Sequence, residues 1–209
     1  MYDTRIDLSI SIREKVAPML QARLADCVDL FTQVKQAHWN VKGPHFIALH
    51  ELFDKTAEIV AAQGDMLAER ITELGARADG TARVVAMQSM LTEFPLDTKE
   101  GLAYVAAVAE KLSLFARALR VSIDLAAKLR DAATAELFTQ ITRAIDKQLW
   151  LMDAHLLAGR WSAHSLIQGS RPADRLERRT IYGTAIWHSR GSESRGRQPP
   201  LGAARWHTT

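Results

Sequence analysis

The sequence predicts an all-α protein, a four-helix bundle in which one of the connections is long. Four segments of about 25 residues each carry apolar residues at steps of three and four, which is the spacing of one face of a helix. The strict alternation of apolar and polar residues that is typical of strands is absent. Two connections are short turns, whereas the middle one spans residues 75–98.

The composition is typical of a globular domain with an additional segment. The chain has 209 residues, of which 47% are hydrophobic and 24% charged. It lacks an apolar run of the ~18 residues that a membrane span requires, and residues 1–15 lack the pattern of a secretory signal. The single cysteine, Cys27, cannot form an internal disulfide and is expected in the core. We therefore expect a cytoplasmic protein without a membrane partner.

The first helix is expected to begin near Ser11 and to end before the turn residues 40–44. Ser11 and Glu14 predict a capping box at its start. Pro18 lies inside the segment and predicts a kink or a restart of the helix. The apolar stripe of this helix consists of Leu20, Leu24, Cys27, Phe31, Val34 and His38.

The remaining helices are expected over about residues 46–74, 99–129 and 132–158. The second stripe is Phe46, Leu49, Phe53, Ala57, Val60, Gly64, Leu67, Ile71 and Leu74. The third is Leu102, Val105, Ala109, Leu112, Ala116, Leu119, Ile123 and Ala126, and the fourth is Phe138, Ile141, Ile145, Leu149, Met152 and Leu156.

The connection between the second and third helices indicates the topology. Residues 75–98 are far longer than the turns on either side, and residues 84–94 have the pattern of a short helix that ends before Pro95. A long crossover favours the ferritin-like arrangement over a simple up-and-down bundle. We therefore predict a ferritin-like four-helix bundle over residues 1–159.

Histidines and carboxylates lie at metal-ligand spacing along one edge of the second helix. His50 and Asp54 are four residues apart, as are Asp65 and Glu69, so each pair can reach one ion. Eleven residues, close to three turns, separate Asp54 from Asp65, so all four share one strip beside the apolar stripe. His38 ends the first helix in register with its buried stripe, where an unpaired imidazole is costly.

A structural interpretation of the same residues stays open. A single histidine at the end of an apolar stripe is usually a hydrogen-bonded core residue, and carboxylates beside a stripe are usually solvated. Five such groups in register within 32 residues favour a metal site more than any one of them does. Mixed imidazole and carboxylate ligands suit iron, manganese or zinc.

One ion cannot reach both ends of the strip, because Asp54 and Asp65 are about 16 Å apart along the helix axis. An antiparallel second copy of the helix, related by a two-fold axis near residue 60, would complete the site. It places Asp65 and Glu69 of one chain opposite His50 and Asp54 of the other. The small residues expected to permit close approach at this crossing are Ala57, Ala61, Ala62 and Gly64.

The segments KQAHWNVKGPHFIALHELFD, DMLAER and IDKQLWLMDAHL resemble the Dps family (DNA-binding proteins from starved cells, or mini-ferritins). The resemblance covers about residues 5–158. It implies a dodecameric hollow shell of ferritin-like subunits and a ferroxidase activity. Iron(II) would be oxidised between two-fold-related subunits, by hydrogen peroxide in preference to oxygen, and ferric oxide stored inside.

The resemblance also implies which residues hold a mono-iron or di-iron site. The implied ligands are His38, His50 and Asp54 from one chain and Asp65 and Glu69 from its partner. Asp54 and Glu69 would bind iron most directly, and the others would complete a second, weaker position. Trp39 lies next to the site and by resemblance takes up oxidising equivalents; a bulky core anchor is the structural alternative.

Other polar residues near these segments have weaker assignments. His45 and Glu58 match no ligand of the family, and we expect them around the ligands or facing solvent. Iron entry in this fold family uses acidic three-fold channels, for which Asp124, Asp131 and Glu136 are candidates. Ordinary surface charge is the alternative for these three.

Residues 160–209 form a second segment, an Arg-rich tail without a sustained period. It carries 9 basic residues, all Arg, against 3 acidic ones, whereas residues 1–159 carry 18 against 21. We predict a flexible basic arm whose arginines neutralise DNA phosphates, with Trp161, Trp187 or Trp206 stacking on bases. The candidate DNA contacts are Arg171, Arg175, Arg178, Arg179, Arg190, Arg195 and Arg197. The alternative is an appendage with no nucleic-acid role.

Two functions of different classes follow from the sequence. The first is a ferroxidase that consumes peroxide, stores iron and protects DNA from oxidative damage. The second is a nucleoid-associated, DNA-compacting shell in which the basic tail has the main role and the iron site is vestigial. The complete set of ligand residues favours the first function.

Overall fold

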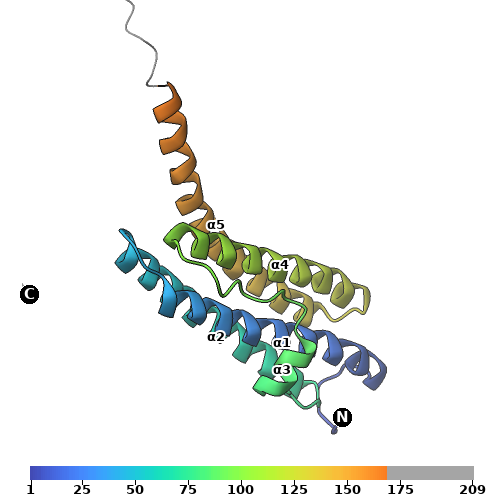
Figure 1. Ribbon diagram of the computed structural model, residues 1–209. Helices are drawn as coiled ribbons and strands as arrows, with labels where there is room; N and C mark the ends of the chain where they lie inside the picture. Colours follow the sequence, from blue (N-terminus) through green and yellow to red (C-terminus); the bar gives the residue numbers. More distant parts are fainter. Residues whose placement is uncertain (169–209) are drawn as a thin grey trace, which may run out of the picture. The chain divides into compact units, whose positions relative to one another are not determined.

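The computed structural model describes residues 1–168 of the chain, and the side chains of residues 1–157. It contains five helices and, in that range, no strand (Figure 1). The helices are α1 (Ile10–Asn40), α2 (Phe46–Glu73), α3 (Ala82–Gln88), α4 (Gly101–Lys128) and α5 (Ala132–Gln168). None of them is long and apolar enough to span a bilayer. The predicted all-α class is confirmed.

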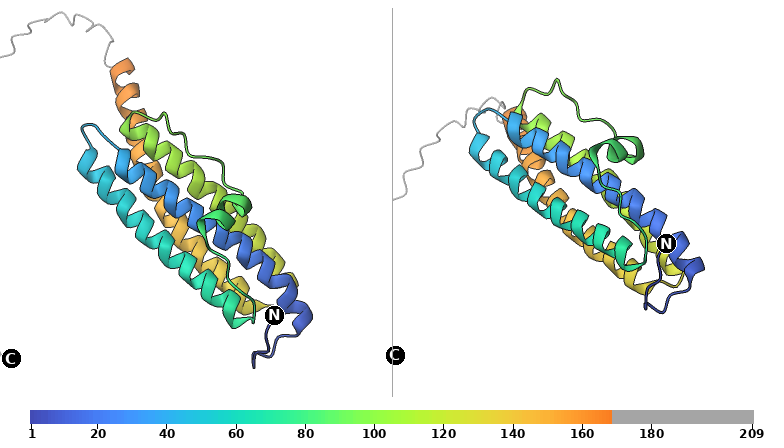
Figure 2. Two further views of the ribbon diagram at one scale, coloured as in Figure 1. Left: turned by 60° about the horizontal axis from the view of Figure 1, so that its bottom comes forward. Right: turned by 90° about the horizontal axis from the view of Figure 1, so that it is seen from below.

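Four long helices form the bundle, and α3 lies outside it against α1 (Figure 2). The pairs α1–α2 and α4–α5 pack along most of their length, and contacts of α1 with α4 and of α2 with α5 close the ring. Short turns join the helices of each pair. The segment that carries α3 runs from the end of α2 to the start of α4, as the predicted ferritin-like topology requires.

The four predicted apolar stripes meet in the core. Every member of the second stripe after Phe46 is buried, from Leu49 to Leu74. Burying an aliphatic or aromatic side chain of this kind stabilises the fold by about 1.5–3 kcal/mol. Phe46 and Leu102 are the exceptions, each 39% exposed, because each lies in the first turn of its helix at the end of the bundle. The half-buried members are Phe31, Ile123, Leu149 and Leu156.

The predicted capping box of α1 and one of the two alternatives for Pro18, a restart of the helix, were wrong. The helix begins at Ile10 after the N-cap residue Ser9, and no side chain caps it, so Ser11 and Glu14 do not form a capping box. The Ser11 hydroxyl instead lies 3.0 Å from that of Ser9. Pro18 does not restart the helix, which is continuous through it.

The short crossover helix and the last helix differ in length from the prediction. α3 ends at Gln88, not near residue 94, because the residues that follow bond to α1 and not within a helix of their own. The backbone N–H of Met90 donates to Asp26 (2.8 Å) and the Ser89 hydroxyl donates to Asp29 (2.6 Å). α5 extends to Gln168, beyond the expected end at residue 158. The domain boundary at residues 159 and 160 stays a prediction.

Asp131 is a helix cap and does not line a channel. Its carboxylate accepts hydrogen bonds from the Thr134 backbone N–H (3.0 Å) and hydroxyl (2.6 Å), and Arg70 pairs with it at 3.2 Å. The side chain is 1% exposed, so the expectation of a channel-lining Asp131 was wrong. Asp124 and Glu136 are exposed and remain candidates.

The turn between α4 and α5 contains one strained residue, Arg130, whose φ is +61°. Glycine adopts this left-handed conformation without a steric cost and is preferred directly after helices. We predict that Arg130→Gly raises the free energy of unfolding by about 0.5–1 kcal/mol. The control Lys128→Gly, at the last residue of α4, should lower it by up to about 1 kcal/mol. Denaturant unfolding at one protein concentration measures both, and a destabilised Arg130→Gly would contradict the account of strain.

Candidate metal centre

The end of α1 and the start of α2 bring three of the predicted ligands together. The turn over residues 41–45 reverses the chain, so the last turn of α1 lies beside the second turn of α2. The rings of His38 and His50 are stacked, with centroids 3.7 Å apart and an interplanar angle of 23°. The Nε2 atom of His38 lies 3.8 Å from Oδ1 of Asp54.

The two imidazoles are held by a reciprocal pair of hydrogen bonds. Nδ1 of His38 lies 2.9 Å from the carbonyl oxygen of His50, and Nδ1 of His50 lies 2.9 Å from the carbonyl oxygen of His38. The His38 carbonyl belongs to the last turn of α1, where carbonyls have no partner within the helix. The ring of His50 therefore supplies a hydrogen-bond donor to a carbonyl at the end of α1, and the same bond joins α1 to α2.

These bonds also determine which ring nitrogens are available to a metal. A carbonyl oxygen can only accept a hydrogen bond, so Nδ1 of each imidazole carries the proton. In the neutral rings Nε2 then keeps its lone pair, the state in which histidine binds metals. A backbone carbonyl behind the ligating imidazole fixes the tautomer and the orientation of the ring. The backbone alone thus fixes the orientation of both rings and leaves the Nε2 atoms of His38 and His50 without a bond to these carbonyls.

Lys35 occupies the position beside Asp54. Its Nζ atom donates a hydrogen bond to Asp54 Oδ1 at 2.7 Å and lies 6.0 Å from the centre of the Trp39 ring. This hydrogen bond is the main cause that lowers the pKa of the Asp54 carboxyl. Asp54 is therefore a carboxylate near neutral pH. A metal cation would have to compete with the Lys35 ammonium for its Oδ1 atom. Sequence reasoning missed Lys35, although it precedes His38 by three residues and so shares its face of α1.

The other two predicted ligands lie toward the opposite end of α2. Asp65 and Glu69 are both exposed. Within the part of the chain that the structure describes, no three side chains of His, Cys, Asp or Glu lie close enough together to hold a metal ion. In one chain the predicted ligands therefore fall into two separate groups, one at the junction of α1 and α2 and one toward the end of α2.

The aromatic and polar neighbours of the site can now be assigned. Trp39 is 67% exposed, so the interpretation as a core anchor was wrong for the single chain. His45 is exposed, and Glu58 is exposed and pairs with Lys55 at 2.6 Å. Both face solvent, which is one of the two positions expected for them.

The small residues near the middle of α2 do not all face outward. Ala57 is 1% exposed, and a Cβ at Gly64 would lie 3.6 Å from the sulfur of Cys27, so both positions belong to the core. Only Ala61 and Ala62 are exposed and free to approach a second copy. The expectation that all four small residues line a crossing was wrong for Ala57 and Gly64.

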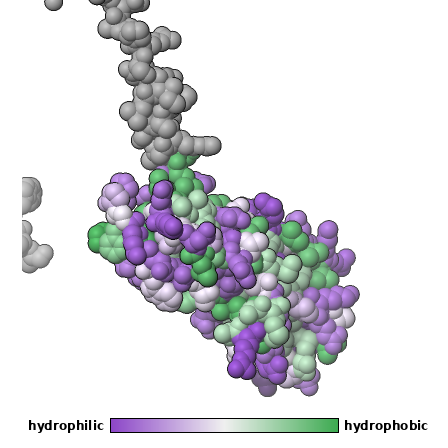
Figure 3. Space-filling model, viewed as in Figure 1, coloured by the Kyte–Doolittle hydropathy of each residue, from purple (hydrophilic) through white to green (hydrophobic). Residues whose placement is uncertain are grey.

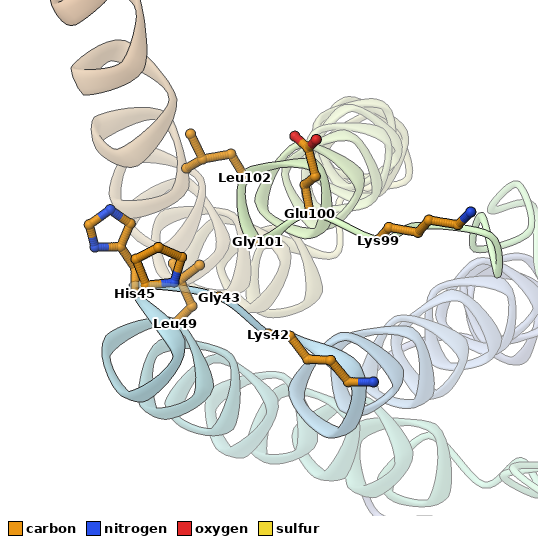
Figure 4. Close-up of a pocket in the computed structure, with 9 residues that line it drawn as sticks. Lys42, Gly43, His45, Leu49, Lys99, Glu100, Gly101 and Leu102 are labelled. Atoms are coloured by element: carbon orange, nitrogen blue, oxygen red, sulfur yellow. The ribbon is translucent and has the colours of Figure 1, made fainter.

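A separate cavity of about 390 Å³ lies at the end of the bundle, between the α1–α2 turn and the start of α4 (Figure 4). Gly101 permits this close seating, because a Cβ there would lie 3.1 Å from Leu49 Cδ1 and 3.2 Å from the Lys42 carbonyl oxygen. The Lys42 and Lys99 side chains extend away from His45 in Figure 4. None of the predicted metal ligands lines this cavity, so it is distinct from the candidate centre.

Comparison with known proteins identifies the family. A model described as a ferritin-like domain matches residues 18–160. The chain is 36% identical over 155 residues to the DNA protection during starvation protein of Agrobacterium fabrum, which covers 74% of this chain and 96% of the relative. The chain belongs to the Dps family. The predicted resemblance and the ferritin-like fold are confirmed.

Solved Dps structures have the same fold. The Mycobacterium smegmatis Dps in its tetragonal form superposes with a TM-score of 0.71 at 30% identity, over 74% of this chain and 94% of that one. A Dps protein from Bacillus brevis superposes with a TM-score of 0.67 at 28% identity, over 71% of this chain and 99% of that one. The ferritin-like match ends at residue 160. The seven tail arginines predicted to contact DNA, from Arg171 to Arg197, lie outside the described residues.

The Lys35–Asp54 pair predicts a measurable effect on metal binding. In Lys35→Met the competing ammonium is gone, so Co²⁺ should bind about threefold to tenfold more tightly, as for a partly screened ion pair. The control Lys55→Met removes an exposed lysine one residue after Asp54 that pairs with Glu58, and its affinity should match the wild type. Titration followed by the visible absorption of Co²⁺ measures both. Equal affinities in Lys35→Met and wild type would show that Lys35 does not compete.

Proposed function

We propose that this Dps-family protein is a ferroxidase that oxidises iron(II) and stores the ferric product inside a dodecameric shell. Each reaction site is shared by two copies of the chain, and hydrogen peroxide is the preferred oxidant. The observation that carries the proposal is the division of the predicted ligands into two incomplete groups, one at the junction of α1 and α2 and one toward the end of α2. His38, His50 and Asp54 form one group, and Asp65 and Glu69 form the other.

The length of α2 supports a shared site. α2 is continuous from Phe46 to Glu73, so Asp54 and Asp65 are about 16 Å apart along its axis. A two-fold axis near residue 60 with antiparallel α2 helices brings Asp65 and Glu69 of one copy to His50 and Asp54 of the other. Two such sites form in each dimer, and each contains carboxylate and imidazole ligands.

The ligand set suits iron(II) as a substrate. The two Nε2 atoms are neutral donors whose positions are fixed by backbone hydrogen bonds. Asp54 and Glu69 supply negative charge, which stabilises the oxidised ion more than the reduced one, and oxygen ligands are those that iron(III) prefers. Lys35 leaves Asp54 when a metal cation binds there, so the charge of the site changes little on loading.

Two iron(II) ions held together match the electron demand of peroxide. Each ion gives up one electron, the O–O bond breaks, and two protons are taken up, so that two iron(III) ions and two molecules of water result. Because both electrons are transferred in one event, hydroxyl radical is not released. Enclosing the ferric oxide within the shell then keeps iron away from DNA.

Protection of DNA is also the role named for the Agrobacterium fabrum relative. Direct DNA binding is a separate hypothesis, which rests on the Arg-rich tail beyond the described residues. Residues 1–159 carry a net charge of −3 (18 basic against 21 acidic residues), so the body repels the phosphate backbone and binding would depend on the tail. A cytoplasmic, nucleoid-associated protein fits both roles.

Removing one carboxylate from each ligand group tests the proposal. Loss of a residue that only orients a metal ligand typically lowers activity by about 10–100-fold. Asp54→Ala/Glu69→Ala removes ligands themselves, so it should slow the oxidation of iron(II) by peroxide by more than that factor. The control Glu51→Ala/Glu58→Ala removes two exposed carboxylates of the same helix and should keep the wild-type rate. Stopped-flow absorbance of iron(III) measures the rate.

The particle size of all three proteins provides the second readout. Each should elute as a particle of about twelve chains, because the altered side chains are not part of the core. Wild-type rates in Asp54→Ala/Glu69→Ala would contradict the assignment of the ligands. An iron-oxidising monomer of 23.3 kDa would contradict the shared site.

A further inference from the structure

The N-terminal segment, residues 1–9, lies beside the end of α2 in both views of Figure 2. The backbone N–H of Tyr2 donates a hydrogen bond to the Gly75 carbonyl oxygen at 2.8 Å, and the Tyr2 hydroxyl donates one to the Thr72 carbonyl oxygen. Hydrophilic and hydrophobic residues are mixed on the face of the molecule that Figure 3 shows, and Tyr2 itself is exposed. Directed hydrogen bonds, rather than burial of Tyr2, therefore attach the segment to α2.

Arg13, near the start of α1, bonds to both the N-terminal segment and the end of α2. It is buried, with 7% of its surface exposed. Its guanidinium donates from Nε to the Leu8 carbonyl oxygen at 3.2 Å. It also donates from Nη1 to the carbonyl oxygens of Leu74 at 3.1 Å and of Tyr2 at 3.5 Å. Because a guanidinium is always charged and only donates, it suits a site of three carbonyl oxygens.

Gly75 lets the end of α2 and the N-terminal segment approach closely. Its φ is +84°, a conformation that glycine adopts without a steric cost. A Cβ at this position would lie 2.5 Å from the Tyr2 carbonyl oxygen and 3.0 Å from Nη1 of Arg13. A Cβ at Gly80, by contrast, would have nothing within 4 Å. Any other residue at position 75 would push the N-terminal segment away from α2.

These bonds satisfy carbonyl groups at the end of α2, where the last turn of a helix has no partners of its own. The N-terminal segment and Arg13 together bond to the carbonyl oxygens of Thr72, Leu74 and Gly75. Helix ends fray and open locally more readily than helix interiors do. The bonds therefore keep the last turn of α2 helical.

The last turn of α2 also carries Glu69, because the helix ends at Glu73, four residues later. The Thr72 hydroxyl donates a hydrogen bond to the Glu69 carbonyl oxygen at 2.8 Å, and the Thr72 carbonyl oxygen accepts the bond from Tyr2. Asp65 lies one turn earlier, farther from the end. Opening of the last turn would therefore displace Glu69 more than Asp65.

We propose that the N-terminal segment positions Glu69 for metal binding, with Tyr2 and Arg13 as positioning residues. The inference rests on the proposed function, in which Glu69 is a ligand of the shared site. Held in a complete helical turn, Glu69 stays in register with Asp65 and loses less conformational entropy when a metal binds. The bonds of the segment are to backbone carbonyls and not to ligand side chains, so its effect on the metal is indirect.

Removing residues 2–7 tests the inference, since it takes away both hydrogen bonds of Tyr2 to α2. If Glu69 is then correctly placed in only about a tenth to a third of the molecules, Co²⁺ should bind about threefold to tenfold more weakly. The control Asp3→Ala/Arg5→Ala/Asp7→Ala removes the same charges at exposed positions, keeps the backbone of the segment and should bind like the wild type. Titration followed by the visible absorption of Co²⁺ measures the affinities.

A single hydroxyl provides a milder test of the same contact. Tyr2→Phe should speed the hydrogen exchange of the backbone amides of residues 70–76 at least about threefold, whereas residues 53–60 in the middle of α2 should keep their rates. The control Tyr104→Phe also removes a tyrosine hydroxyl that donates to a backbone carbonyl, that of Thr98 at 2.7 Å. It should leave the exchange of residues 70–76 unchanged. Hydrogen exchange followed by mass spectrometry measures both variants.

A positioning role differs from a merely structural one in its dependence on Glu69. In Glu69→Gln the positioned ligand is already impaired, so removing residues 2–7 should weaken Co²⁺ binding by less than about twofold further. In Asp54→Asn, which alters a ligand of the other group, the deletion should keep its full effect. An equal loss of affinity in both backgrounds would overturn the positioning role, because a general loosening of the fold or a smaller particle does not act through Glu69.

The outcomes separate this inference from the proposed function. Wild-type Co²⁺ affinity after the deletion, together with a weakened Glu69→Gln, would contradict the inference and leave the shared site standing. Wild-type affinity in Glu69→Gln would remove Glu69 from the ligands and contradict the proposed site as well as the inference. Unchanged exchange of residues 70–76 in both Tyr2→Phe and the deletion would show that the N-terminal segment does not hold the end of α2.

Discussion

The rise of about 1.5 Å per residue along α2 is the constraint on which the proposed reaction site depends. It fixes the two ligand groups too far apart to share an ion within one chain, and nothing in the continuous helix from Phe46 to Glu73 relieves that separation. In the proposed function, metal chemistry at this strip therefore requires a second copy. Assembly and activity then depend on each other, since each site takes ligands from two chains.

The reciprocal bonds between His38 and His50 fix the positions of two of the proposed ligands without any metal. Each ring is fixed by the backbone carbonyl of the other residue, so neither ring depends on a third side chain for its orientation. The same bonds join the end of α1 to α2. The conformational entropy of these two side chains is thus lost during folding. Less entropy is then lost when a ligand binds to them. Lys35 pairs with the Asp54 carboxylate at 2.7 Å and so offsets its charge when no metal is bound.

The periodicity of the sequence predicted the helices, the buried faces and the crossover, because each follows from local spacing along the chain. Spacing also placed His50 and Asp54 side by side, and the family resemblance added His38 to them. It could not identify the Lys35–Asp54 pair or the reciprocal histidine bonds, which depend on how α1 and α2 face each other.

Features that arise from contacts between distant segments were likewise missed. α3 is shorter than its apolar pattern predicts because Asp26 and Asp29, some 60 positions earlier in the chain, bond to the residues that follow it. Asp131 has the sequence context of a surface carboxylate, but Arg70 and the start of α5 bury it as a cap. The helical spacing allowed Gly64 to lie either in the core or on the outer face of α2. In the structure it is buried and packs against Cys27.

Complementation between two inactive variants tests the shared site most directly. One carries His50→Ala/Asp54→Ala and the other Asp65→Ala/Glu69→Ala, so every site is damaged in either protein alone. When equal amounts co-assemble, half of the dimers are mixed, and each mixed dimer has one site with both lesions and one with none. Co-expressed or co-refolded particles should therefore recover about a quarter of the wild-type rate of iron(II) oxidation. Co-assembled particles that remain as inactive as either parent would contradict the account, because they would place each site within one chain.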